Sequence, residues 1–206
     1  KQLPGRKSDV KDAQWIATAL LKGLVRNSFV PDSMIRQLHL YGRRINELNK
    51  DIIRCEQRVE MILQSCNIRI SNYVSNIDGK SYQKVVGALL EGERSADKLV
   101  KLIHGRTLNK HGRATVRDSL EGYVQQADID LLKQYMEALK MHQAQKQTCL
   151  IEMVKLCKKH YDRAFTLLQS IPAIKEQSAA IIISEIGTDM TLFATAAALV
   201  SWAGLR

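Results

Sequence analysis

The chain lacks the features that mark membrane-spanning and secreted proteins. Its 206 residues contain no apolar run of about 18 residues, the length that a membrane-spanning helix requires. The first 15 residues carry two acids and no apolar segment, so they do not form a signal peptide. The four cysteines form no CxxC pair and indicate no disulfide framework. These absences predict a protein of a reducing, cytoplasmic compartment with no membrane partner.

Aromatic residues and acids are both in short supply. Only 5% of the residues are aromatic, which disfavours single-strand binding by base stacking. The chain has 31 Lys and Arg against 21 Asp and Glu, a net charge of +10, and this balance favours a polyanionic partner. With 45% apolar and 25% charged residues the composition is globular, and the length suits one large or two small domains. Contact with the backbone of a duplex or of structured RNA fits these features best.

The positive charge is concentrated in residues 98–117, which hold six Lys or Arg, two His and no acid. One interpretation of this run is a solvated loop and helix face. The interpretation we favour is a nucleic-acid contact, because cations contribute most to phosphate binding where no neighbouring acid pairs with them. The candidates for phosphate contact are Arg106, Lys110, Arg113 and Arg117.

Two long stretches carry apolar residues at alternating spacings of 3 and 4, the pattern of a coiled-coil helix. The first lies within residues 31–66, and its stripe is Leu38, Tyr41, Ile45, Leu48, Ile52, Cys55, Val59, Ile62 and Cys66. The second lies within residues 128–170, and its stripe is Ile129, Leu132, Met136, Leu139, Leu150, Met153, Cys157, Ala164 and Leu168, with the polar Gln143 and Lys146 in the middle. Between them, residues 67–127 are divided by glycines into short helices near 82–90, 96–103 and 115–123.

The two long helices most simply pair antiparallel, with the insert at the far tip. The same surfaces could pair between chains, which would make a homo-oligomer, a dimer or higher. No stretch shows convincing strand alternation, so the predicted fold is all-α. We expect three parts: residues 1–30, a coiled-coil part at 31–165 with the basic insert 67–127, and residues 166–206.

The C-terminal part has the pattern of a helix–hairpin–helix. A helix is expected to end before the turn at residues 171–175, a second runs over about 176–186, and a third covers 192–202 after a break at Gly187. Such a hairpin can point backbone N–H groups at a phosphate, because the first N–H groups of a helix have no intrahelical partner. An ordinary helical corner is the simpler interpretation.

Asp9 and Asp12 are three residues apart in a predicted helix that continues to about Leu24. Both carboxylates therefore lie on one face of its first turn. One interpretation is that they only cap the helix and favour its positive end. The alternative is that they hold Mg²⁺ ions for phosphodiester chemistry.

Two strings, together, resemble one protein family. Residues 5–17 read GRKSDVKDAQWIA, and residues 171–205 read IPAIKEQSAAIIISEIGTDMTLFATAAALVSWAGL. They resemble the DEDD-type insertion-sequence transposases of the insertion-sequence-110 group, which are RNA-guided recombinases. The resemblance implies an internal fragment that spans the end of a RuvC-like domain, a coiled coil, and the start of a helix-hairpin-helix-like transposase domain. The rest of the RuvC-like α/β core would lie upstream of Lys1. Ala173 and Lys175 depart from the family pattern, which has glycines there.

The resemblance implies DNA strand cleavage and rejoining by a bacterial, nucleoid-associated enzyme of a mobile element. Asp9 and Asp12 match the last two acids of the DEDD tetrad and would bind the divalent metal, Mg²⁺. The nucleophilic serine would follow Arg206, since Ser201 matches a packing position, and the fragment alone should be inactive. The implied partners are DNA at the element ends and target, and a guide RNA. The residues expected to bind nucleic acid are Arg6, Lys7, Arg106, Lys110, Arg113, Arg117 and Lys175.

Two different functions are also compatible with the composition. A non-enzymatic, basic coiled-coil protein could bridge or package nucleic acid. A protein-interaction adaptor could carry its charge for solubility only, and it would bind nucleic acid weakly even at low salt. The pairing of Asp9 and Asp12 with the C-terminal string favours the transposase.

Overall fold

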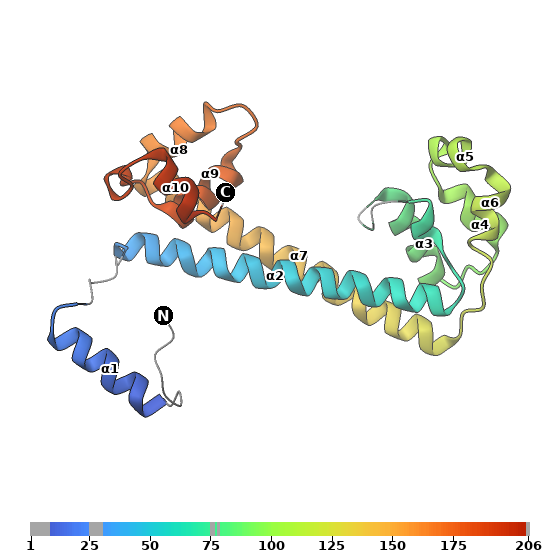
Figure 1. Ribbon diagram of the computed structural model, residues 1–206. Helices are drawn as coiled ribbons and strands as arrows, with labels where there is room; N and C mark the ends of the chain where they lie inside the picture. The colour runs from blue at the N-terminus through green and yellow to red at the C-terminus, as the bar shows by residue number, and fades with distance from the viewer. Residues whose placement is uncertain (1–8, 25–30, 75–76, 78, 205–206) are drawn as a thin grey trace.

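The computed structural model describes residues 9–24, 31–74, 77 and 79–204. All regular secondary structure in these residues is helical, which confirms the all-α prediction. Within the same residues no helix combines the length and the apolar character needed to cross a bilayer. Figure 1 shows an elongated rod of two long helices with a group of short helices at each end.

The rod consists of α2 (Ser33–Ser65) and α7 (Gln126–His160), which lie side by side and antiparallel (Figure 1). The carboxylate of Asp32 starts α2 by accepting the N–H groups of Met34 and Ile35 at 2.7 and 2.9 Å. A reciprocal capping box between Gln125 and Asp128 starts α7. The apolar stripe predicted for α2 is buried or half-buried along its whole length, so the 3–4 periodicity identified the contact face correctly.

The insert forms a helical cap at the far end of the rod, which we call the tip (Figure 1). It contains α3 (Lys80–Leu90), α4 (Ala96–Leu99), α5 (Gly105–His111) and α6 (Arg113–Asp118), with short 3-10 turns at Ile70–Asn72 and Val100–Leu102. These helices enclose Tyr82 and share a core with the ends of α2 and α7. The helix predicted near 115–123 was placed wrongly: α6 ends at Asp118, and α5 was not predicted at all.

At the opposite end, the base, α8 (Asp162–Gln169) and α9 (Glu176–Ile186) pack against α2 and α7. The prediction of one helix over 128–170 was wrong, because the chain leaves helical geometry at Tyr161 (φ −135°). This break turns α8 back so that Phe165 is buried with Leu38, Met153 and Ile183 in one core. The prediction for α9 was correct to the residue.

The two ends of the described chain contribute little to these cores. In α1 (Asp9–Leu21) the apolar Val10, Ile16 and Leu20 are all exposed. Beyond α9, a 3-10 turn (Met190–Leu192) and α10 (Ala196–Trp202) replace the single helix predicted for 192–202. An edge-to-face contact between Phe193 and Trp202 closes this last segment.

Candidate nucleic-acid interface and acidic pair

The acid-free run folds into a basic corner at the tip. Helices α5 and α6 meet at Gly112, whose φ of 84° is accessible to glycine and strained for other residues. The imidazole of His104 starts α5 by accepting the N–H of Arg106 at 3.2 Å. The side chains of Arg106, Lys110 and Arg113 are exposed, and none forms an ion pair with any described residue. We call these three residues the tip patch.

Arg117 differs from the tip patch although it belongs to the same run. Its guanidinium donates to the carboxylates of Asp97, Asp118 and Glu121, each at 3.0 Å. The hydrogen bonds to Asp97 and then to Asp118 are the main causes that raise the pKa of Arg117. Its charge is therefore compensated inside the protein, and it links α4 to α6. Lys98 is likewise paired, with Glu93 at 2.9 Å.

Asp9 and Asp12 lie in the first turn of α1 and are both exposed. Carboxylate oxygens are ligands that suit Mg²⁺, which commonly takes one or two carboxylates together with water and substrate phosphates. The pair fits such an ion as part of a ligand set. Among the described residues, no group of three or more potential metal ligands is assembled. Arg6 and Lys7, which precede the pair, lie outside the described residues.

The turn between α8 and α9 contains no glycine, although one of its residues has a left-handed φ. Ala173 has a φ of 72°, in the left-handed region where a Cβ is disfavoured. Lys175 has a φ of −99° and begins α9 as its N-cap residue, with no side-chain capping bond. Its side chain is exposed. Next to it, Glu176 pairs with Lys158 of α7 at 2.5 Å, which ties the start of α9 to the rod.

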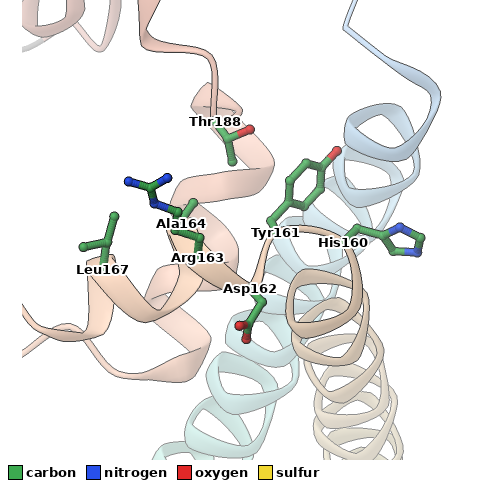
Figure 2. A pocket seen from close by; sticks show the side chains of 7 residues that line it. All are labelled: His160, Tyr161, Asp162, Arg163, Ala164, Leu167 and Thr188. Carbon is green, nitrogen blue, oxygen red and sulfur yellow. The ribbon is translucent and has the colours of Figure 1, made fainter.

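A cavity at the junction of α7 and α8 was not predicted from the sequence. It has a volume of about 500 Å³ and is lined by His160, Tyr161, Asp162, Arg163, Ala164, Leu167 and Thr188. Figure 2 shows that the His160 and Arg163 side chains point in different directions, so the lining does not converge on one point. The hydroxyl of Tyr161 instead donates to the Asp32 carboxylate, at 3.2 Å to each oxygen. Tyr161 and Asp32 are far apart in the sequence, so no local sequence pattern predicts this hydrogen bond.

This contact perturbs both partners. Burial, with the neighbouring negative charge of Asp32, raises the pKa of Tyr161 to about 12. The pKa of Asp32 is lowered, mainly by the hydrogen bond from the N–H of Ile35, with a smaller effect from the Tyr161 hydroxyl. The same carboxylate therefore caps α2 and fastens it to the junction of α7 and α8.

Comparison with known proteins identifies both ends of the chain. Residues 165–206 match the family model described as Transposase IS116/IS110/IS902 family, and residues 1–68 match a transposase model of the DEDD type from the same IS110 group. The two matched segments together make up more than half of the 206 residues. No curated protein and no solved structure matches the chain. On the two family matches, the chain belongs to the IS110 family of transposases.

Proposed function

We propose that this transposase chain serves DNA strand cleavage and rejoining at the ends and target of an insertion sequence, with a guide RNA as a further partner. The two family matches support the reaction class. The tip patch carries the nucleic-acid part of the proposal, because its three exposed cations have no acid partner in the described structure. Lys175, at the start of α9, is a further candidate for phosphate contact.

The tip patch can be tested by the salt dependence of binding. Each cation that neutralises a phosphate contributes about 0.7–0.9 to the slope of log K against log salt. Replacing Arg106, Lys110 and Arg113 with Ala should therefore lower this slope by about 2–2.7 for a DNA duplex or a structured RNA. The control is Lys98→Ala with Arg117→Ala, which removes two cations of the same run that are already paired. An unchanged slope in the tip variant would exclude the patch as a contact.

In the acidic pair, we propose that Asp9 and Asp12 hold Mg²⁺. The bound ion would supply positive charge for phosphodiester chemistry. The two carboxylates would orient it from one turn of α1, and the remaining ligands would come from outside the described residues. The proposed serine nucleophile follows the Ala-Gly-Leu string in the family pattern.

The metal role can be separated from helix capping in a transposase that contains the complete acidic tetrad. Asp12→Asn should abolish metal-dependent cleavage and leave thermal unfolding unchanged, because an exposed amide can still occupy the first turn. Asp162→Asn is the control, since Asp162 is also an exposed acid in the first turn of a helix. If Asp12→Asn still cleaves DNA with unaltered metal dependence, Asp12 is not a metal ligand and its role is limited to helix capping.

We also propose that the rod mediates homo-oligomer formation. Along α7, Met141, Ala144, Thr148 and Ile151 follow one another at spacings of 3 and 4, and all are exposed and uncharged. A charge introduced on such a face should block association. Met141→Glu should therefore lower the mass measured by sedimentation, whereas Ile53→Glu on α2 should not. Equal masses for wild type and Met141→Glu would place the contact elsewhere.

A further inference from the structure

The four acids of α2 are all engaged, which leaves some of its cations without partners. Glu47 pairs with Arg44 at 3.3 Å and Asp51 with Arg54 at 3.0 Å. Glu60 accepts hydrogen bonds from the Tyr82 hydroxyl, at 2.9 Å, and from the side chains of Ser71 and Gln64. Glu56 is also engaged in a contact. The ion pairs that α2 forms with described residues therefore engage only Arg44 and Arg54 among its cations.

Three of the four other cations of α2, all except Arg58, form a straight row. Arg36, Arg43 and Lys50 are seven residues apart, so they lie on one helix face about 10.5 Å from one another. All three are exposed, and this face is opposite the stripe that packs on α7. None forms an ion pair with a described residue, although Arg36 is near enough to Asp32 to make a minor contribution to lowering its pKa after the main effect of the Ile35 N–H. We call Arg36, Arg43 and Lys50 the α2 row.

Toward the tip, the positions that continue the spacing of the α2 row are uncharged. The next two positions at the same spacing are Gln57 and Gln64, both exposed. Outward positions of paired helices usually carry charges of both signs, which suits solubility and side-to-side ion pairs. A row of a single sign on a rigid helix is instead suited to a regular polyanion.

We propose that the α2 row contacts the phosphate backbone of a double-helical nucleic acid that lies along the rod. The inference rests on the proposed nucleic-acid function and adds a second contact surface to the tip patch. The row spans about 21 Å, the length of roughly six base pairs, over which a duplex presents about twelve phosphates. A duplex needs no aromatic platform, and none is present in the row. A straight rod of about 50 Å also matches a stiff duplex better than a flexible single strand.

The test compares two variants that lose the same charge. The first replaces the α2 row: Arg36→Gln, Arg43→Gln and Lys50→Gln. The control replaces three cations of the rod that are already ion-paired: Arg44→Gln, Arg54→Gln and Lys155→Gln. Binding of a random-sequence DNA duplex of about 24 base pairs, and of an RNA hairpin of similar length, is measured by fluorescence anisotropy from about 50 to 200 mM KCl. Surface changes of this kind should leave thermal unfolding nearly unaltered.

For the α2 row variant we expect the salt slope to fall by about 2–2.7, and for the control by less than half of that. A loss with the DNA duplex only, or with the RNA hairpin only, would identify which nucleic acid lies along the rod. Equal losses in the two variants would show an effect of overall charge and would overturn the proposal, as would an unchanged slope in the row variant.

The tip variant in the same assay separates this inference from the function on which it rests. If the tip variant keeps the wild-type slope while the row variant loses its share, the tip contact fails and the row stands. If only the tip variant loses slope, nucleic acid binds at the tip and the row is refuted.

Discussion

Of the glycines in the described residues, Gly122 should be the one where an added methyl group lowers the free energy of unfolding most. It lies in the loop between α6 and α7, beside Cys66 at the end of α2. A Cβ at Gly122 would be 2.1 Å from the carbonyl oxygen of Cys66 and 2.8 Å from Cγ1 of Ile68. The same carbonyl accepts the N–H of Tyr123 at 3.0 Å, and Ile68 is buried. Neither neighbour can withdraw without breaking a contact.

The cost of Gly122→Ala follows from these contacts. Separating the Tyr123 N–H from the Cys66 carbonyl costs about 1 kcal/mol or more. Forcing an extra methyl group into a packed site typically costs about 1–3 kcal/mol. We therefore expect Gly122→Ala to lower the free energy of unfolding by about 2–4 kcal/mol in urea denaturation followed by far-UV circular dichroism.

Gly87 provides a matched control with the opposite expected sign. It lies inside α3, and a Cβ there would meet no atom within 4 Å. Gly87→Ala should raise the free energy of unfolding by about 0.5–1 kcal/mol, because alanine loses less backbone entropy in a helix. If Gly122→Ala were as stable as Gly87→Ala, the loop after α6 would not pack on the end of α2, and the reasoning would be refuted.

Two further substitutions test the base of the rod. Ala173→Gly should raise the free energy of unfolding by about 0.5–1 kcal/mol, because it relieves the left-handed φ of 72°. The control Ala144→Gly, within α7, should lower the free energy of unfolding by about 1 kcal/mol. A loss of stability for Ala173→Gly would contradict the turn geometry. Asp32→Ala should cost about 1 kcal/mol at pH 7. Because the pKa of Asp32 is lower in the folded state, the stabilisation by its carboxylate is present above the unfolded-state pKa of about 3.9 and is lost as pH falls below that value. The unfolding curves of wild type and Asp32→Ala should therefore converge in acid. A difference in the free energy of unfolding that stays constant with pH would refute the role of the carboxylate charge.

The rod could be predicted from the sequence because one physical requirement acts along its whole length. Burying one face of a long helix demands apolar residues at spacings of 3 and 4, and a stripe that keeps this spacing from Leu38 to Cys66 fits neither a strand nor a loop. The end of α9 was also predictable, since Gly187 has the positive φ that commonly follows the last turn of a helix.

The errors occurred where no local signal was present. The break at Tyr161 involves neither proline nor glycine, and the apolar spacing continues across it into α8. Tertiary contacts determine it, through the Asp32 bond to Tyr161 and the burial of Phe165. Helix α5 has seven residues and no buried side chain, so it leaves no periodicity to detect.

Charge composition was a partial guide to the candidate interface for a similar reason. The sequence shows that residues 98–117 lack acids, but not that Arg117 reaches Asp97 and two later acids. The i,i+4 spacing of Arg117 and Glu121 was the one sequence signal for that pairing. The candidate residues thus divide into the exposed tip patch and a structural cation only when distances are known.

The core at the base joins the two segments that match the transposase family. Leu38 and Ile45 belong to the N-terminal match, Phe165 and Ile183 belong to the C-terminal one, and all four are buried in the same cluster. Residues of both matched segments therefore contribute to one buried core. The tip patch lies between the two matches and at the other end of the rod. The 33 residues of α2 span about 50 Å, so nucleic acid bound at the tip patch would contact the protein about that far from the region where both family segments meet.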